Sequence, residues 1–487
     1  MTTQYFVPHY LPQVGIGSDS NHLEQLNAGE FDLSVVDKKY SPIESVVRIS
    51  AKPEHDGTLD DKSVAVFIAA DPKKVTRLWT MKMGGRVRLE KETGGVWKEV
   101  GEQAIAADKV GLINNFLHAM FCRIEITLGD SVRIADSGTR PYVYKSFFEQ
   151  LLNYSATYQK SILKHDGYVP DNPVYATKTN ETVADSDALS AALEVDPTIT
   201  TGRAYNQAWG MRRKDFSKGQ WYEFYMPIYH DLLKAKKCLP PGVEMKINFY
   251  FNTDQYPIWM GSSSTTGTTT DPPKYRLAFE KDSFYVDYER FVVKKEITRA
   301  YQRTIVRSYR VTKSMGPSIG RESWIPRASH LPSQVIVCFV KGEAYDGSTT
   351  DNPYYLQHLD LTNASLVVNS EAEPSQGYYT VKYGDKNPRG KAFFWKMMRE
   401  IGHVTGTQFE TGLTMEGFFS SQFFLCFDRS PCKDNSFEGA LYDSGSLSLK
   451  LELKGELPVN NMQVIALMSY SSNVCIYNDT VKIEFFD

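Results

Sequence analysis

The sequence has no long hydrophobic run and no start that resembles a secretion signal. Its longest apolar runs, such as VAVFIAA at Val64–Ala70, are much shorter than the roughly 18 residues that a membrane-spanning helix needs. The N-terminus, MTTQYFVPHYLPQVG, has no basic segment followed by an apolar one, so we expect no signal peptide. These absences predict a soluble protein that stays inside the cell that makes it.

Cysteine is sparse, and charge is nearly balanced. The six cysteines are scattered, and most lie in apolar, strand-like runs such as FCRIEI and VIVCFV, which predicts buried, reduced thiols rather than a disulfide framework. Cys426 and Cys432 lie close together in the sequence, but no second pair completes a zinc site.

The formal net charge of −3 gives the whole chain no polycationic character, which argues against a dedicated nucleic-acid binder.

Motifs for nucleophilic or phosphate chemistry lack the context that they need. GPSIG (Gly316–Gly320) matches the G-x-S-x-G pattern around Ser318, but a nucleophile elbow needs a helix after the serine. The RESWIPRASHLP that follows cannot form one, so we interpret GPSIG as a turn. VGIGSDSN (Val14–Asn21) has two glycines of a phosphate-binding fingerprint without the third, and we interpret it as part of a flexible arm.

The histidines do not predict a metal or acid–base site. None of the nine follows an H-x-x-x-H or H-E-x-x-H spacing, and His118 and His358 lie in segments typical of the core or of turns. His230 and Asp231 are adjacent, and adjacent strand residues point to opposite faces. We therefore predict no catalytic, cofactor-binding or metal-binding residue and no enzymatic activity.

What the sequence does contain is strand signal. Its 487 residues exceed one ordinary core, and its 13% aromatic content favours strands. Apolar and polar residues alternate with period two in many short segments. The clearest cases are Ser45–Ser50, Ser63–Ala69, Phe121–Gly129, Phe284–Val293, Ala364–Asn369 and SLSLKLELK, in which Leu447, Leu449, Leu451 and Leu453 share one face. One face of each strand is expected to be buried against a second sheet.

Two segments predict helices, and two predict long loops. Apolar residues recur at i, i+3, i+4 and i+7 in Tyr142–Leu152 and in Ala392–Ile401. Asp171–Gly202 and Gly261–Pro273 are polar and far longer than the turns of a β-sandwich. Loops of this length usually carry function or contacts.

The same order of elements occurs twice. A strand, a helix, a loop and a strand that begins with Leu-Pro follow one another in each half, as LPPGVEMKINFYF in the first and LPVNNMQVIALM in the second. In this alignment Val243, Met245, Ile247 and Phe249 match Met462, Val464, Ala466 and Met468. The repeat predicts two Greek-key jelly rolls that meet near Lys294–Glu296.

The predicted fold class is therefore all-β, with two consecutive jelly-roll β-sandwich domains and one short helix inserted in each. The predicted domains are an N-terminal arm at 1–40, a first jelly roll with long loops at 41–295, and a second jelly roll at 296–487.

Four segments resemble a known family. VGLINNFLHAMFCRIEITLGD (Val110–Asp130) and MPIYHDLLKAKKCLPPGVEMKINFYFN (Met226–Asn252) resemble the first jelly roll of major capsid proteins of polintons (Mavericks) and adintoviruses. AYDGSTTDNPYYLQHLDLTNASLVVN (Ala344–Asn369) and GSLSLKLELKGELPVNNMQVIALMSY (Gly445–Tyr470) resemble the second. Virophages and several large DNA viruses share this architecture. The resemblance implies a double jelly-roll major capsid protein of the virion, made and assembled inside the host cell.

This resemblance sets the expected partners. Two sandwiches in each of three chains give six similar blocks, which approximate a hexagon, so we expect pseudo-hexagonal homotrimeric capsomers of an icosahedral shell. Neighbouring trimers, penton proteins and minor capsid or cement proteins are expected to bind them, whereas no cofactor and no small-molecule substrate is expected. The N-terminal arm, with its aromatics and prolines, suits docking on an adjacent subunit.

One basic segment offers a contact with packaged DNA. KKEITRAYQRTIVRSYRVTKS contains a single acid, Glu296, and two tyrosines of the kind that line single-strand grooves. Its cations are Lys294, Lys295, Arg299, Arg303, Arg307, Arg310 and Lys313. The alternative is a solvated strand whose charges pair with acids elsewhere, which the negative net charge favours.

Two other functions remain open from sequence. A two-domain jelly-roll lectin would present aromatic loops to a sugar. A β-sandwich glycosidase would need two inward-facing carboxylates about 5–10 Å apart, which a sequence does not place.

Overall fold

The computed structural model describes most of the chain but not all of it. The described residues are 46–53, 63–101, 108, 110–129, 132–136, 138–173, 176–177, 206–216, 219–234, 238–239, 241–260, 274–292, 299–312, 318–324, 331–374, 388–401, 411–429, 445–453, 461–477 and 480–485. The predicted arm at 1–40, the loop at 261–273 and most of the loop at 171–202 lie outside them.

The first half of the chain forms two large antiparallel sheets. Sheet 1 has seven strands, with the path β1-β13-β3-β12 and with β4, β8 and β9 also paired to β3. Its strands are β1 (Val46–Ala51), β3 (Lys74–Thr93), β4 (Val96–Glu99), β8 (Tyr222–Pro227), β9 (Cys238–Leu239), β12 (Tyr275–Phe279) and β13 (Tyr285–Val292). Sheet 2 has the order β2-β10-β6-β7, from β2 (Ser63–Ile68), β6 (Phe121–Leu128), β7 (Val132–Ala135) and β10 (Met245–Phe251). A separate pair joins β5 (Val110–Leu112) to β11 (Ile258–Met260).

The second half repeats this plan. Sheet 3 has the order β14-β21-β16-β19, with β22 paired to β21. Its strands are β14 (Arg299–Thr312), β16 (Gln334–Lys341), β19 (Phe424–Asp428), β21 (Asn461–Tyr477) and β22 (Thr480–Phe485). Sheet 4 has the order β15-β20-β17-β18, from β15 (Ser318–Trp324), β17 (Leu361–Val368), β18 (Glu371–Glu373) and β20 (Leu447–Leu453). As predicted, Leu447, Leu449, Leu451 and Leu453 are all buried.

Strand order shows that the two halves have one topology. Sheet 1 matches sheet 3, because β1, β13, β3 and β8 are paired in the same order as β14, β21, β16 and β19. Sheet 2 matches sheet 4, because β2, β10, β6 and β7 are paired in the same order as β15, β20, β17 and β18. The matched strands also follow one another in the same order along the chain. The helix α4 (Pro141–Leu152) follows β7, and α10 (Pro388–Glu400) follows the equivalent β18. The predicted all-β fold of two jelly rolls is confirmed, and so are both predicted helices.

The Leu-Pro alignment of the two halves was wrong in its detail. The strand after the first Leu-Pro is β10, which lies between β2 and β6. The strand after the second is β21, which lies between β14 and β16. The true equivalent of β10 is β20, and that of β21 is β13. Alternating apolar residues occur in both kinds of strand because both bury one face in a sandwich, so the pattern alone does not identify the strand.

The fold also has more helices than one per domain. The described residues add α3 (Phe116–Ala119), α5 (Ala156–His165), α7 (Gln207–Phe216), α8 (Asp231–Lys234), α9 (Gly342–Asp346) and α11 (Met415–Ser420). Most are short, and α5 buries only Gln159 and Leu163, so their sequences carry little helical periodicity. None of the helices in the described residues is long and apolar enough to span a membrane.

Strand β3 was not predicted, and its two adjacent glycines explain why. Gly84 and Gly85 interrupt the apolar pattern of KVTRLWTMKMGGRVRLEKET, yet the strand continues through them. A Cβ at Gly84 would lie 2.5 Å from the ring of Tyr285 on β13. Glycine is required there because an aromatic ring lies directly over the backbone.

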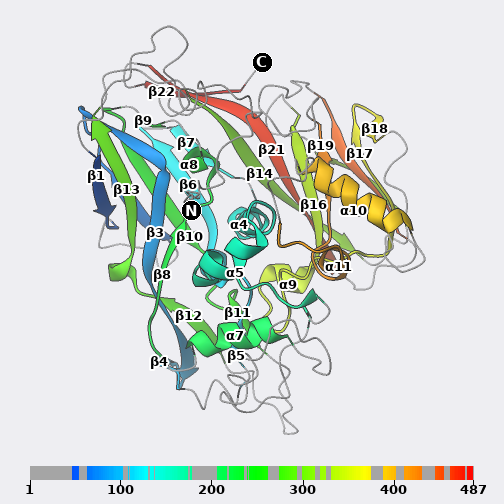
Figure 1. The fold of residues 1–487 in the computed structure, drawn as a ribbon, viewed down its shortest axis with the longest axis horizontal. Coiled ribbons are helices and arrows are strands. Elements are labelled where there is room, and N and C mark those ends of the chain that lie inside the picture. The colour runs from blue at the N-terminus through cyan, green and yellow to red at the C-terminus, as the bar shows by residue number, and fades with distance from the viewer. Residues whose placement is uncertain are drawn as a thin grey trace, which may run out of the picture.

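The two jelly rolls share one hydrophobic core. Buried residues from both halves form a single cluster, which includes Phe147, Phe148, Tyr354 and Phe424. In Figure 1, β1 and β13 of sheet 1 lie at the left, β17 and β18 of sheet 4 lie at the right, and α4 lies between the two groups of strands. No described strand of one half pairs with a strand of the other. The predicted domain boundary at 295/296 falls between β13 and β14, in residues outside the described part, and stays a prediction.

Candidate functional site

The junction between the jelly rolls is built around α4. The ring of Phe147 stacks on Tyr354 with 4.4 Å between centroids, and Phe148 meets Phe424 of β19 edge-to-face at 5.6 Å. Tyr144 stacks on Tyr345 of α9 at 6.0 Å. These pairs contribute both buried area and favourable ring geometry. They fix the first jelly roll against the second along one face of the helix.

Polar contacts complete the junction. The amide of Asn115 donates to the Tyr354 hydroxyl at 3.3 Å, and that of Asn352 donates to the carboxylate of Asp171 at 3.0 Å. Asp171 also accepts from Arg212 at 2.6 Å. Because these groups are buried or half-buried, each bond satisfies a donor that would otherwise be costly to desolvate. These polar bonds add to the aromatic contacts at the junction.

A buried ionic cluster lies beside this junction. The ammonium of Lys145, on α4, is 2.9 Å from Asp136 after β7 and 2.5 Å from Asp231 at the start of α8. Lys234 of α8 pairs with both Glu149 and Asp231. Burial alone would raise the pKa of Asp231, but the two ammonium groups hold it well below its usual range. The cluster ties α4, α8 and the end of β7 into one unit.

A small cavity of about 100 Å³ separates this cluster from the second jelly roll. On one side lie Lys145, Phe148, Glu149, Leu152, Asn153, Asp231 and Lys234, and on the other lie Gln334, Ile336, Ile401, Leu467 and Ser469. Ile336 of β16 and Leu467 of β21 belong to sheet 3, so α4 faces a sheet of the neighbouring jelly roll here.

Two buried histidines sit near the cluster without acid–base capacity near neutral pH. His118 is fully buried, as predicted, and its Nδ1 is 3.0 Å from the Tyr142 hydroxyl. Burial lowers the pKa of His118 to about 3. Burial, followed by the charge of Lys145, lowers the pKa of His230 to about 3 as well. Both rings are therefore neutral at pH 7.

The sequence argument about His230 and Asp231 assumed a strand, and that assumption was wrong. Asp231 begins the helix α8, and its carboxylate turns to Lys145. His230 Nδ1 accepts from the backbone N–H of Leu232 at 3.3 Å. The Asp231 carboxylate is thus bound to Lys145, and the His230 ring is bound to the backbone of α8.

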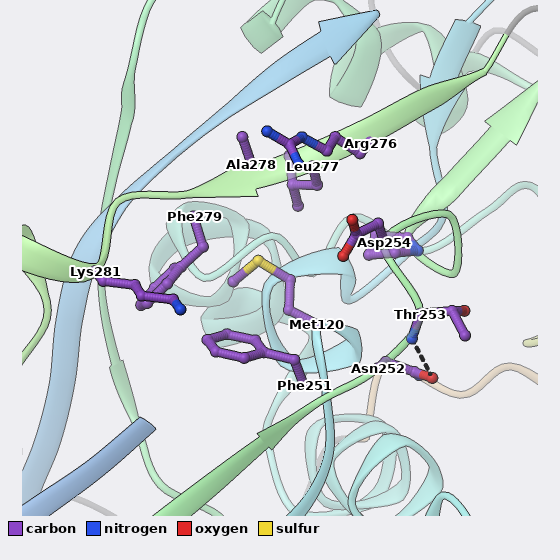
Figure 2. A pocket seen from close by; sticks show the side chains of 11 residues that line it. Met120, Phe251, Asn252, Thr253, Asp254, Arg276, Leu277, Ala278, Phe279 and Lys281 are labelled. Carbon is purple, nitrogen blue, oxygen red and sulfur yellow. Dashed lines mark hydrogen bonds between the residues drawn. The ribbon is translucent and has the colours of Figure 1, made fainter. Parts of the chain in front are cut away.

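A pocket in the first jelly roll has a volume of about 440 Å³. Met120, Phe251, Leu277 and Phe279 give it an apolar wall, as Figure 2 shows. Asp254 and Lys281 project from opposite sides (Figure 2). Among the described residues that line it, Asp254 is the one carboxylate, whereas a glycosidase needs two. The nearby Arg276 is already bound to Glu90 at 2.7 Å.

The other sequence motifs gain no catalytic context from the structure. Ser318 opens β15, which continues as a strand to Trp324, so the helix that a nucleophile elbow needs is absent from these described residues. Within the described part of the chain, no group of three or more His, Cys, Asp or Glu residues is placed to hold a metal ion. Among the cysteines whose side chains are described, Cys122, Cys238, Cys338 and Cys426 form no disulfide. Cys432 and the segment Val14–Asn21 lie outside the described residues.

The basic segment is only partly described. β14 pairs with β21 over its whole length, from Arg299 opposite Val474 to Thr312 opposite Asn461. Lys294, Lys295 and Lys313 lie outside the described residues, and only the backbone of β14 is described. Contact of Arg299, Arg303, Arg307 or Arg310 with DNA stays a prediction.

Comparison with solved structures identifies the fold of this chain. A chain from the cryo-EM structure of the Sputnik virophage matches with a TM-score of 0.52 at 6% sequence identity, covering 94% of this chain and 92% of that one. This chain has the double jelly-roll fold. The mavirus major capsid protein matches with a TM-score of 0.46 at 8% identity, covering 100% and 95%, and PBCV-1 Vp54 with 0.44 at 11%, covering 94% and 100%. No protein-family model and no curated protein matches the sequence.

Proposed function

We propose that the chain is a major capsid protein, the structural subunit of the icosahedral shell of a DNA virus. The observation that carries this proposal is the fusion of two jelly rolls of identical strand order through a rigid, aromatic junction. A subunit of this kind supplies two similar blocks, so three copies supply the six that surround a pseudo-sixfold axis. The similar chain comes from the structure of a whole virus, the Sputnik virophage, and the match covers 92% of that chain, which supports a role in a virion.

The finer parts of the proposal follow from this role. The capsomer is a homotrimer, the two jelly rolls divide near 295/296, and penton and minor capsid proteins bind at the edges of the array. The protein acts in the virion without enzymatic activity. The arm at 1–40 and the loops at 171–202 and 261–273 make contacts between chains. The basic residues Lys294, Arg299, Arg303, Arg307 and Arg310 contact packaged DNA.

Electron microscopy of the purified full chain tests the role. We expect oligomers with a hexagonal outline and, under assembly conditions, closed particles. Monomers that give no particle at any salt concentration or pH would overturn the proposal.

The second candidate is a jelly-roll lectin, and the pocket of Figure 2 favours it. Phe251 and Phe279 offer apolar faces, and Asn252 and Asp254 offer the polar groups that a sugar hydroxyl would bind. Saturable glycan binding that Asp254→Ala abolishes, in a protein that never assembles, would establish this function instead.

The DNA contact has a separate test in particles. Charge reversal at Arg303 and Arg307 should lower the nucleic acid packaged per particle while the thermal unfolding midpoint stays unchanged. Lys246→Glu, at an exposed position of β10, is the matched control. Unchanged genome content would show that the segment does not contact DNA.

A further inference from the structure

The equivalence of α4 and α10 has a consequence for assembly. α4 follows β7 in sheet 2 and faces sheet 3 of the other jelly roll through Phe148, Glu149 and Leu152. α10 occupies the same topological place after β18 in sheet 4. The sheet equivalent to sheet 3 is sheet 1, which belongs to the same chain but lies on the opposite side of the molecule (Figure 1). α10 therefore has an equivalent binding surface only on a second copy.

The outward side of α10 is exposed to solvent but has the residue composition of a protein interface. Its inward side buries Phe393 and Met397, which pack near β19 and α11. Its outward side exposes Trp395, whose 68% exposure is the highest of the large exposed hydrophobic residues in the described part. Three exposed cations flank this indole: Lys391, Lys396 and Arg399. Tryptophan and arginine are the residues most enriched where interfaces concentrate binding energy. We call Lys391, Trp395, Lys396 and Arg399 the α10 face.

Sheet 1 carries a matching surface on its solvent side. Tyr285, Gly84 and Tyr225 are cross-strand neighbours on β13, β3 and β8. Because Gly84 has no side chain, the Tyr285 ring lies over it and stacks on Tyr225 with 6.4 Å between centroids. Tyr225 is 48% exposed, and Val46 on the edge strand β1 is 47% exposed. We call Val46, Tyr225, Tyr285, Asp287 and Glu289 the sheet 1 face.

The sheet 1 face carries charges of both signs, because the Lys82 ammonium lies 6.0 Å from the centre of the Tyr225 ring, beside two carboxylates. Asp287 and Glu289 lie on the same side of β13 as Tyr285, because alternate strand residues share a face. Both are half-buried on the sheet surface. Glu289 already binds Arg48 and Arg77, so the surface offers an ordered set of mixed charges rather than a bare acidic patch. Cations of the α10 face can share these carboxylates while Trp395 covers the two tyrosines.

We propose that the α10 face of one copy docks on the sheet 1 face of the next, in the way that α4 docks on sheet 3 within one chain. The proposal rests on the capsomer function above and names the surfaces through which the copies meet. The two faces lie on opposite sides of the molecule, so the contact is heterologous. Together with the α4 junction inside each chain, three such contacts would join six jelly rolls into one ring. Trp395 is its central anchor.

Cysteine cross-linking tests the pairing directly. The double variant Trp395→Cys/Tyr225→Cys should form disulfides between copies on mild oxidation and give a dimer and trimer ladder on a denaturing gel. Each single variant should remain monomeric on that gel, which also controls for the native cysteines. Trp395→Cys/Val96→Cys, with the second cysteine at another exposed position, should give no ladder. A ladder from the control pair equal to that from the test pair would overturn the proposal.

Mixing two single-face variants tests the heterologous geometry. Trp395→Glu and Tyr225→Glu should each keep the wild-type unfolding midpoint but weaken association by on the order of 30-fold or more. Mixed one to one, they should form dimers, because the intact α10 face of the second variant still meets the intact sheet 1 face of the first.

The outcomes separate this inference from the proposed function. A wild-type chain that forms trimers while Trp395→Glu forms them equally well would overturn the docking proposal and leave the capsid function standing. A wild-type chain that never associates would overturn both.

Discussion

At the scale of single residues, the ionic cluster around Lys145 is the most exacting feature of the molecule. The Lys145 side chain is 2% exposed, and its ammonium group lies between Asp136 and Asp231. Two carboxylates at such a site are tolerated only because the cation is present, since an unpaired buried charge is far more costly than a missing pair.

Lys145→Met should therefore destabilise the protein by about 3–5 kcal/mol. Urea unfolding followed by tryptophan fluorescence measures the change. Lys246→Met, at an exposed lysine, should change stability by less than about 0.5 kcal/mol. Replacing Asp136 and Asp231 by asparagine in the Lys145→Met background should recover part of the loss. If Lys145→Met is as stable as the control, the cluster does not stabilise the packing of α4 against α8 and the end of β7.

The two buried histidines predict acid lability. Both have a folded pKa of about 3, below the ordinary 6.5, so between these values the unfolded chain binds protons that the folded chain does not. Stability should therefore fall as the pH drops from about 6.5 toward 3. His118→Gln keeps a partner for Tyr142 but cannot titrate, so its unfolding midpoint should fall less steeply than that of the wild type. Parallel curves for the two proteins from pH 7 to pH 4 would contradict this account.

At the scale of elements, α4 determines how the jelly rolls sit together. Phe148→Ala should cost about 3–5 kcal/mol, because it removes the contact with Phe424 and leaves a cavity in a shared core. Trypsin should then separate the two halves faster, at Lys294 or Lys295. Val96→Ala, at an exposed site on β4, is the control and should be cleaved at the wild-type rate. A cleavage rate unchanged by Phe148→Ala would mean that the junction is not held by this helix.

The elements also show how far sequence reasoning reached. The period-two segments predicted most strands, and the apolar spacing of Tyr142–Leu152 predicted α4 to within one residue. The equivalence of β10 with β20 could not be predicted, because pairing partners are distant in sequence and one-sided burial looks alike in every sandwich strand. The continuity of β3 through Gly84 depends on the Tyr285 ring from β13, which lies some 200 residues away in the chain.

The candidate sites were harder to predict from the sequence than the fold was. The residues next to Ser318 were enough to argue against a nucleophile elbow there, and in the structure Ser318 begins a strand rather than preceding a helix. The Lys145 cluster combines residues from three separate elements, so no spacing in the sequence signals it. Trp395 lies within a helix that the sequence predicts, but only its exposure in the folded structure distinguishes it from the buried apolar residues of that helix.

At the scale of the whole molecule, two equivalent sandwiches in one chain explain why the protein should assemble. In our proposal, the α10 face of one chain and the sheet 1 face of the next form a junction of the same kind that each chain contains between its own jelly rolls. A chain with complementary surfaces forms a closed ring or an open filament, and the capsomer that we propose is the ring in which three chains supply six jelly rolls.

The mass of the native protein in solution tests this central claim most directly. Native mass spectrometry or analytical ultracentrifugation at micromolar concentration should show a species of three times the 55.2 kDa chain mass. A protein that remains at 55.2 kDa under every condition, or that forms only dimers, would contradict the account.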